Sequence, residues 1–238
     1  MRIGVAGMVG VGKTTLTRKL GEYLHFRLLL ESVGEDNPWL DLYYGSEDGQ
    51  SRYGFHLQAH FLVSRMKTLR QIHAEGVHYI TDTIADADAQ IFARRLYEQG
   101  HMSDIEWQLY SRLYEELLHS PAGTPPDVLI YLSAPLEEVL RRIRARGRKS
   151  EQDVDITYWT ELHDRYERWA ESYDLSPIVR LDARSYDLKH DPYAVVGIAD
   201  RLRRTLGPEF EICLAEARDA RIAQQAARSA SHRTAARR

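Results

Sequence analysis

Five short apolar runs divide the chain, and longer segments with helical spacing separate them. Each run is brief, carries branched or other apolar side chains, and ends at or just before a Gly, Asp, Ser or Glu. The five runs are Ile3–Ala6, Arg27–Glu31, Val77–Asp82, Val128–Leu132 and Ile178–Asp182. Because strands that alternate with helices build a parallel sheet covered on both faces, the pattern predicts an α/β fold with a five-stranded parallel sheet and three layers.

Polar residues gather where these runs end. Glu31, Asp82 and Asp182 each close an apolar run, and a glycine-rich segment follows Ala6. Ligands bind at the carboxyl ends of the strands in open parallel sheets, so we expect the functional site at this edge.

Helix and loop signals stand between the runs. Ser103 and Glu106 form the Ser-x-x-Glu pattern of a capping box, which predicts a helix that continues through Leu117. The segment 120–126 is predicted to be a loop because it holds two adjacent prolines and Gly123.

The glycine-rich segment is the strongest motif. Residues 7–14 read Gly-Met-Val-Gly-Val-Gly-Lys-Thr, which matches the G-x-x-x-x-G-K-[ST] pattern of a P-loop. Glycines let backbone N–H groups surround phosphates without a Cβ in the way, and the following helix N-terminus adds positive potential. We expect Lys13 to reach the β- and γ-phosphates of ATP and Thr14 to bind Mg²⁺. The nucleotide-binding residues predicted from the motif are Gly7, Gly10, Gly12, Lys13, Thr14 and Thr15.

Composition narrows the class of protein. The 238 residues suit one α/β domain with a tail, and 43% of them are hydrophobic, which suffices for a buried core. A net charge of −3 argues against a dedicated nucleic-acid binder. The single cysteine, Cys213, excludes a disulfide framework and a Cys-rich zinc site, and it fits a reducing compartment. The sequence shows neither a signal peptide nor an apolar run of membrane-spanning length, so we expect a cytoplasmic protein without membrane contact.

The C-terminal part differs in composition. We place the main domain at residues 1–206, and a C-terminal helix with a basic, flexible tail at residues 207–238. Residues 217–238 hold six arginines and one acidic residue, a net charge of +5. Such a tail is either a solvated chain end or a contact for nucleic acid or another anion.

Motifs beyond the P-loop resemble those of a known family. The pieces are Glu31-Ser32-Val33, Asn37-Pro38, Tyr43-Tyr44, Gln58, Arg65, Asp82–Phe92, Leu96–Gly100, Arg142–Glu151, Tyr158 and Leu181–Ala183. In this order and spacing they resemble the deoxynucleoside kinase family, and specifically its bacterial deoxyguanosine/deoxyadenosine kinase branch. The resemblance covers residues 1 to about 205.

The resemblance implies phosphorylation of the 5′-OH of a purine deoxynucleoside, with ATP (or another NTP) and Mg²⁺. Glu31 would be the general base, because a carboxylate there can accept the hydroxyl proton. Gln58 would read the nucleobase edge, since an amide both donates and accepts hydrogen bonds, and Tyr44 would hold the sugar 3′-OH. Arg65 and Asp82 complete this set of expected substrate residues, with Asp82 also near Mg²⁺ through water.

A dense basic run is similar to the family's arginine-rich lid, which closes on ATP. It spans about residues 142–153, and it supplies Arg142, Arg146 and Arg148 as catalytic lid residues. Closure would bring their guanidinium groups to the transferring phosphoryl group. Glu151 resembles the lid acid that contacts the substrate sugar.

The third apolar run departs from the family. The family has an acid-Arg-Ser signature there, whereas this chain has Asp82-Thr83-Ile84. Threonine carries no charge and makes no bidentate contact, so the missing arginine could cost several kcal/mol of transition-state stabilisation. Three explanations stay open: compensation by Arg52 or Arg65, a different substrate, or loss of efficient kinase activity.

Other functions stay open for the same reason. One is a broad-specificity NTP hydrolase. Another is a nucleotide-sensing regulatory subunit whose basic tail contacts DNA or a partner. A nucleoside monophosphate kinase is a closer rival, but it would need further basic residues for the phosphate of its acceptor.

Two predicted helices, at residues 88–97 and 104–118, build a dimer interface in the resembled family. Their pattern alone would also suit helices that cover the sheet. On the resemblance we expect a homodimer.

Four histidines lie close in the sequence without a metal-binding pattern. They are His56, His60, His73 and His78. Only the first two have i, i+4 spacing and no cysteine accompanies them, so we expect no metal site among these four. Among the tryptophans, only Trp39 is expected near the substrate.

Overall fold

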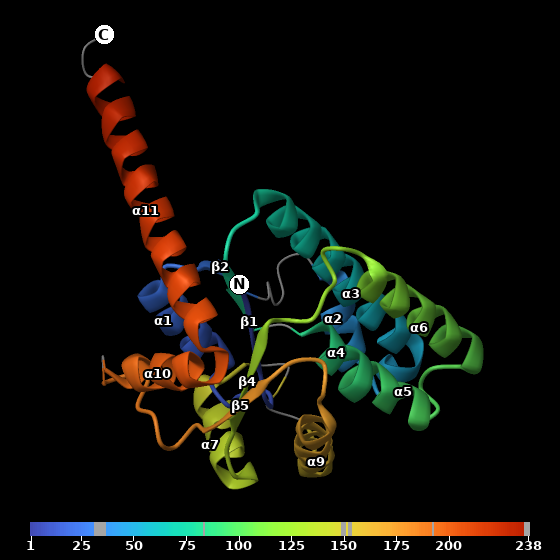
Figure 1. Ribbon diagram of the computed structural model, residues 1–238. Coiled ribbons are helices and arrows are strands. Elements are labelled where there is room, and N and C mark those ends of the chain that lie inside the picture. Colours follow the sequence, from blue (N-terminus) through green and yellow to red (C-terminus); the bar gives the residue numbers. More distant parts are fainter. Residues whose placement is uncertain (31–36, 83, 149–150, 152–153, 192, 236–238) are drawn as a thin grey trace.

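Five parallel strands form one sheet in the order β2-β3-β1-β4-β5. This computed structural model describes residues 1–30, 37–82, 84–148, 151, 154–191 and 193–235. The strands are β1 (Arg2–Ala6), β2 (Arg27–Leu29), β3 (Tyr79–Thr81), β4 (Val128–Ser133) and β5 (Ile178–Asp182). All neighbouring strands pair in parallel, so the predicted α/β fold with a five-stranded parallel sheet is confirmed (Figure 1).

Two strands are shorter than the sequence predicted. The ladder between β2 and β3 joins three residues on each strand and ends where Leu29 faces Thr81. Asp82 therefore lies beyond the ladder, at the carboxyl end of β3. Glu31, which the prediction placed at the end of β2, lies outside the described residues.

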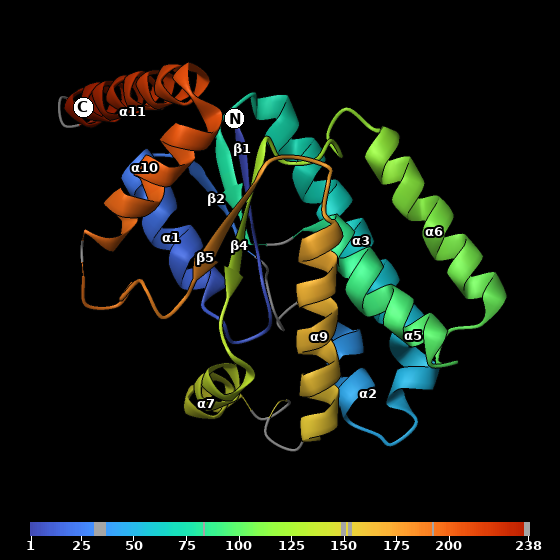
Figure 2. The same cartoon turned by 60° about the horizontal axis from the view of Figure 1, so that its bottom comes forward.

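Helices cover both faces of the sheet (Figure 2). One face carries α1 (Lys13–Leu24) and α10 (Ala194–Leu206), and the other carries α3 (Gly49–Glu75) and α9 (Ile156–Ser172). In α1 the leucines at 16, 20 and 24 are buried, because a spacing of four residues places side chains on the same helix face.

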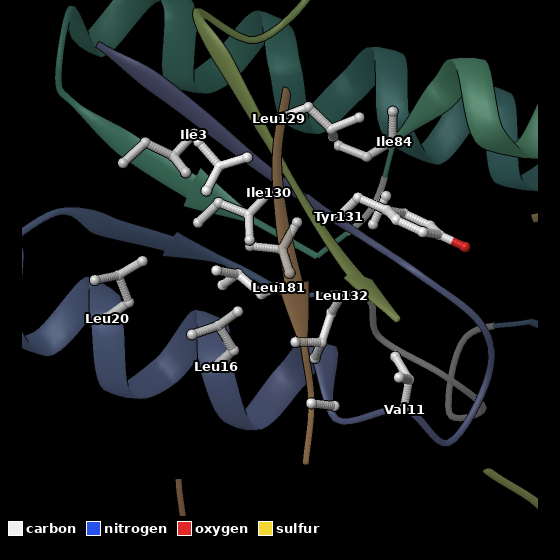
Figure 3. Close-up of a cluster of buried hydrophobic side chains, with 14 of the residues drawn as sticks. Ile3, Val11, Leu16, Leu20, Ile84, Leu129, Ile130, Tyr131, Leu132 and Leu181 are labelled. Carbon is white, nitrogen blue, oxygen red and sulfur yellow. The ribbon is translucent and has the colours of Figure 1, made fainter. Parts of the chain in front are cut away.

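The main core lies on both sides of β4 (Figure 3). Side chains alternate along this strand, so that Ile130 and Leu132 point toward α1 while Leu129 and Tyr131 point to the opposite face. Leu16 of α1 is fully buried against the first pair. Burial of such a leucine contributes about 2 kcal/mol, and this packing fixes the start of α1 relative to the sheet.

A second apolar cluster forms away from the sheet. Besides α3, its helices are α2 (Pro38–Tyr44), α4 (Ala85–Ala87), η1 (Asp88–Ala93), α5 (Arg94–Glu98) and α6 (Asp104–His119). The helix predicted over 88–97 thus begins as the π-helical turn η1 and continues as α5. Such π-helical turns occur frequently at functional sites.

The C-terminal helix α11 (Pro208–Ala235) extends away from the rest of the molecule (Figure 1). Phe210 and Leu214 at its beginning are buried in the main core. The helix continues into the region for which the sequence suggested a flexible tail. Like the other described helices, α11 lacks the apolar stretch that crossing a bilayer requires.

The predicted capping box opens α6. The Glu106 backbone N–H donates a hydrogen bond to Ser103 Oγ at 3.4 Å, and the Ser103 backbone N–H donates to the Glu106 carboxylate at 2.8 Å. Both contacts satisfy N–H groups that the first helical turn leaves without a partner.

Replacing Ser103 with alanine removes one of these acceptors. We expect the free energy of unfolding to fall by about 1 kcal/mol, measured by urea denaturation. Ser64→Ala on the exposed side of α3 is the matched control, and it should change stability little because alanine favours a helix. Equal losses in the two variants would contradict the capping role.

Candidate active site

The segment between β1 and α1 is a tight glycine loop. Gly7, Gly10 and Gly12 have positive φ angles of 143°, 83° and 114°. A Cβ atom at Gly7 would lie 2.2 Å from the Leu132 carbonyl oxygen, so no side chain fits there. Gly12 caps α1 without a side-chain hydrogen bond, which leaves the helix N-terminus open to a phosphate.

Lys13 and Thr14 begin α1 directly after this loop. Lys13 Nζ donates hydrogen bonds to the backbone oxygens of Gly7 (2.8 Å) and Met8 (3.2 Å), so its side chain folds over the loop. Thr14 Oγ1 donates a hydrogen bond to Oδ2 of Asp82 at 2.5 Å. This contact forms because β1 and β3 are parallel neighbours whose carboxyl ends meet at one edge of the sheet.

The oxygens of Thr14 and Asp82 fit a Mg²⁺ ion. Mg²⁺ prefers oxygen ligands and commonly binds through one or two protein side chains together with nucleotide phosphates. Both residues line the cavity beneath the P-loop, and Asp82 is 7% exposed. A buried carboxylate needs a hydrogen-bond donor or a cation nearby, and this position can offer both.

One cavity of about 360 Å³ extends from the P-loop between the helices. Its volume lies in the range of small-molecule sites. The predicted site residues that line it are Gly7, Gly10, Lys13, Thr14, Tyr44, Gln58, Arg65, Asp82, Arg146, Arg148 and Glu151. Gly12 and Thr15 belong to the loop and to the first turn of α1 without lining the cavity.

Gln58, Arg65 and Asp88 are further polar residues that line the cavity. The Gln58 residue is 4% exposed, and its Oε1 atom has no hydrogen-bond partner among the described residues. Arg65 forms a buried ion pair with Asp88. An amide, a guanidinium and a carboxylate therefore surround one space and present both donors and acceptors. Sequence reasoning assigned no role to Asp88, whose partner lies on another helix.

Tyr44 and Glu151 also line the cavity. Burial raises the pKa of the Tyr44 hydroxyl, which also takes part in a hydrogen bond with Tyr158. The Glu151 side chain is 10% exposed and accepts a hydrogen bond from Arg146 at 2.6 Å, while Arg148 lies 3.5 Å away. These side chains give the cavity lining a phenol hydroxyl and a carboxylate, which can form hydrogen bonds with a ligand.

Arg142 lies apart from the other two arginines of the predicted lid. Arg142 belongs to α7 (Leu136–Arg146). Its Nη1 donates a hydrogen bond to the Val11 carbonyl at 2.7 Å, and its Nη2 donates to the Ala183 carbonyl at 3.4 Å. Its Nε donates to Glu138 at 2.6 Å. Arg142 therefore ties the P-loop backbone to α7 and to the end of β5, and it does not line the cavity.

Asp86 lies in α4, directly before η1, and connects this segment to two other helices. Tyr114 of α6 donates a hydrogen bond to its Oδ1 atom, and Trp169 of α9 donates to its Oδ2 atom, both at 2.7 Å. We call Asp86 and its two hydrogen bonds to Tyr114 and Trp169 the Asp86 brace. Because Asp86 lies two residues before Asp88, this brace fixes the backbone that positions the Asp88 carboxylate in the cavity lining. The sequence alone indicated no such role.

Two residues on which the sequence argument depends, Glu31 and Thr83, lie outside the described residues. Arg52, considered as a substitute for the family arginine at Thr83, has a side chain that is 63% exposed and lies 3.5 Å from Asp48. It does not line the cavity, whereas the other candidate, Arg65, does.

Fold and loop together define a P-loop nucleotide-binding protein of the phosphotransferase class. A profile of the deoxynucleoside kinase family matches residues 3–206, and the chain belongs to that family. The sequence-based recognition of the family is therefore confirmed.

Individual relatives agree with this assignment. A deoxyadenosine/deoxycytidine kinase of Bacillus subtilis (strain 168) is 38% identical over 200 residues, which cover 84% of this chain and 90% of the relative. A deoxyadenosine kinase of Dictyostelium discoideum is 32% identical over 183 residues, which cover 76% and 71%. The solved structure of deoxyadenosine kinase from M. mycoides with bound dCTP has a TM-score of 0.70 at 26% identity, covering 86% of this chain and 100% of that one.

The chain is accordingly a kinase that phosphorylates a deoxynucleoside to its monophosphate. Its family implies a nucleotide as the phosphate donor. The alternatives of a broad NTP hydrolase and of a purely regulatory subunit are not favoured.

The Asp86 brace predicts a coupling between stability and nucleoside binding. Asp86→Asn keeps the shape of the side chain but leaves one oxygen for two donors, so the free energy of unfolding should fall by about 1–3 kcal/mol. The nucleoside KM should rise more than the ATP KM, because Asp88 shifts and the P-loop does not. Urea unfolding and steady-state kinetics measure both effects. Asp174→Asn, at an exposed carboxylate, is the control; an unchanged nucleoside KM in Asp86→Asn would contradict the coupling.

Proposed function

We propose that this kinase transfers the γ-phosphoryl group of ATP to the 5′-OH of a purine deoxynucleoside in the presence of Mg²⁺. One observation carries the proposal. The same cavity is lined by Lys13 and Thr14 after the P-loop and by Gln58 with the Arg65–Asp88 pair. A phosphate donor and a nucleoside bound by these two groups of residues share one enclosed space, which supplies the proximity that phosphoryl transfer needs.

The P-loop binds the phosphates. Backbone N–H groups of the loop and the ammonium group of Lys13 hold the β- and γ-phosphates. Thr14 and Asp82 would hold Mg²⁺, which when bound neutralises charge on the phosphate oxygens. Arg146 and Arg148, in the lid segment 142–153, stabilise the same oxygens when they exchange Glu151 for phosphate.

Glu31 is the general base of the proposed mechanism. It follows β2 by two residues in the sequence, and β2 pairs with β3, whose carboxyl end carries Asp82. A carboxylate within hydrogen-bond reach accepts the proton of the 5′-OH as the new O–P bond forms. The resemblance of Glu31-Ser32-Val33 to the family motif supports this role.

Gln58 and the Arg65–Asp88 pair select the base. A purine presents ring nitrogens next to amino or oxo groups, and an amide beside a guanidinium and a carboxylate can pair with such an edge. The names of relatives support a purine, since they include deoxyadenosine and deoxyguanosine kinases. Tyr44 and Glu151, which also line the cavity, hold the sugar 3′-OH.

The kinase also forms a homodimer through α3 and α6 in this proposal. Apolar side chains remain exposed on these two adjacent helices: Ile105 is 79%, Leu109 48% and Val63 59% exposed. The other helix expected at the interface is largely buried within the protomer, since Ile91 is 0% and Leu96 1% exposed. The exposed apolar surface of α3 and α6 therefore supports these helices as the contact between subunits.

Replacing Glu31 with glutamine tests the proposed base. The assay follows γ-labelled ATP with Mg²⁺ and each of the four deoxynucleosides, and it separates labelled monophosphate from free phosphate. The parent protein should label purine deoxynucleosides, and Glu31→Gln should lower kcat by about 100-fold or more while the ATP KM stays similar. Glu171→Gln, at an exposed site on α9, should behave like the parent. Label that appears only in free phosphate would sink the proposed acceptor.

Replacing Gln58 with leucine tests recognition of the base. The substitution introduces an apolar side chain of similar size that cannot form hydrogen bonds. We therefore expect the nucleoside KM to rise about tenfold or more with a small change in the ATP KM. Gln71→Leu lies on the exposed side of the same helix and serves as the control. The proposal predicts that purine and pyrimidine substrates become harder to distinguish in Gln58→Leu alone; unaltered discrimination would contradict it.

A further inference from the structure

Three side chains of metal-binding type meet at the edge of the sheet opposite the active site. His78 directly precedes β3, and Cys213 and Glu216 lie on α11. One ligand atom of each, a ring nitrogen, the thiol sulfur and a carboxylate oxygen, lies within 4.8 Å of the other two. The P-loop follows the carboxyl end of β1, whereas this cluster lies at the amino end of the neighbouring strand, so it belongs to a separate place in the fold.

The His78 ring is held in one orientation. It stacks on Phe26 with ring centroids 5.2 Å apart, and its side chain is 19% exposed. Its Nδ1 atom contacts the Met1 amino group, and its Nε2 atom lies 2.9 Å from the Glu216 carboxylate. The ring thus presents Nε2 to α11, in the way that a hydrogen bond at one ring nitrogen orients a histidine ligand.

The rotation of α11 is fixed as well. Phe210, Leu214 and Ala217 are buried in the main core, and they alternate along the helix with the two ligand-type residues. Cys213 and Glu216 have i, i+3 spacing and therefore lie on the same side of the helix, facing His78. Burial raises the pKa of the Cys213 thiol, so without a cation the group stays a protonated thiol.

The geometry points to a Zn²⁺ site formed by His78 Nε2, the Cys213 thiolate and the Glu216 carboxylate, with water in the fourth position. Zn²⁺ binds sulfur at about 2.3 Å and nitrogen or oxygen at about 2.0–2.2 Å in a tetrahedron. Ligand atoms around it are therefore about 3.3–3.8 Å apart. The three ligand atoms lie within 4.8 Å of one another, so no pair lies more than about 1 Å beyond the upper end of this spacing.

Binding of Zn²⁺ at this site is accompanied by the release of a proton from Cys213. The Cys213 thiol releases its proton to solvent as the sulfur–zinc bond forms. With Zn²⁺ on Nε2, His78 is the neutral tautomer that carries its one ring proton on Nδ1. No redox step is involved, because Zn²⁺ keeps its oxidation state.

The ion joins α11 to the sheet. His78 is next to β3, and the other two ligands come from the helix that extends away from the body (Figure 1). Zn²⁺ that binds the folded protein more tightly than the unfolded chain raises the melting temperature. The site therefore stabilises the attachment of the C-terminal helix and takes no part in phosphoryl transfer.

The test uses the full chain without a histidine tag, stripped of metal by a chelator and dialysed against Zn²⁺ or Co²⁺. We expect one bound equivalent of Zn²⁺, a rise in melting temperature, and a thiolate-to-cobalt charge-transfer absorption with Co²⁺. Cys213→Ser should abolish that absorption. Cys213→Ser and His78→Gln should each weaken Zn²⁺ binding at least tenfold. His190→Gln, at an exposed histidine 3.0 Å from Asp187, is the control and should bind like the parent.

Circular dichroism and the stabilisation by MgATP show whether each variant is folded. Cys213→Ser is nearly isosteric and keeps the result interpretable if His78→Gln fails to fold. Absence of the charge-transfer absorption in the parent protein, or equal Zn²⁺ affinity in the parent and Cys213→Ser, would overturn the proposed site.

Discussion

The parallel pairing of β1 with β3 is the constraint on which the active site depends. Its register, with Gly4 opposite Thr81, places the end of β3 beside the last part of β1, which continues to Ala6. The P-loop after β1 and Asp82 after β3 therefore face each other, and the hydrogen bond from Thr14 to Asp82 follows from that alignment. A shift of one residue would turn Asp82 to the other face of the sheet, because side chains alternate along a strand. The strand ladder thus sets the relative positions of Thr14 and Asp82 as well as the fold.

The polar group proposed to bind the nucleobase depends on contacts between helices. Asp86 joins α4 to α6 and α9, and the next acidic residue along the chain, Asp88, pairs with Arg65 of α3. A buried ion pair costs desolvation energy and seldom adds much stability, but it fixes the positions of its charges. A ligand that pairs with both groups and with Gln58 recovers part of that cost. Helix packing therefore prepares this part of the cavity for a planar polar ring before any ligand binds.

Sequence spacing was sufficient to predict a feature wherever the interacting residues are neighbours in the chain. The P-loop at residues 7–14, the capping box of Ser103 and the five apolar runs all belong to this kind. It was not sufficient where only the fold brings partners together. The metal-site search considered histidines close in sequence, whereas His78 has its ligand-type neighbours on α11. Arg142 was grouped with the lid because the basic run resembles the family's lid, and spacing alone did not reveal its hydrogen bond to the P-loop backbone.

Position 83 holds a threonine where the family has an arginine, so positive charge for the transferring phosphoryl group has to come from other residues. Of the two arginines considered as substitutes, Arg52 lies at the surface and Arg65 is engaged with Asp88 in the nucleoside pocket. Arg146 and Arg148 line the cavity, and both interact with Glu151. In the proposed mechanism, phosphate oxygens compete with this carboxylate for the guanidinium groups, since both are anionic hydrogen-bond acceptors. Under that proposal, release of Glu151 toward the sugar and capture of phosphate by Arg146 are one exchange, which would couple binding of the nucleoside to stabilisation of the transferring group.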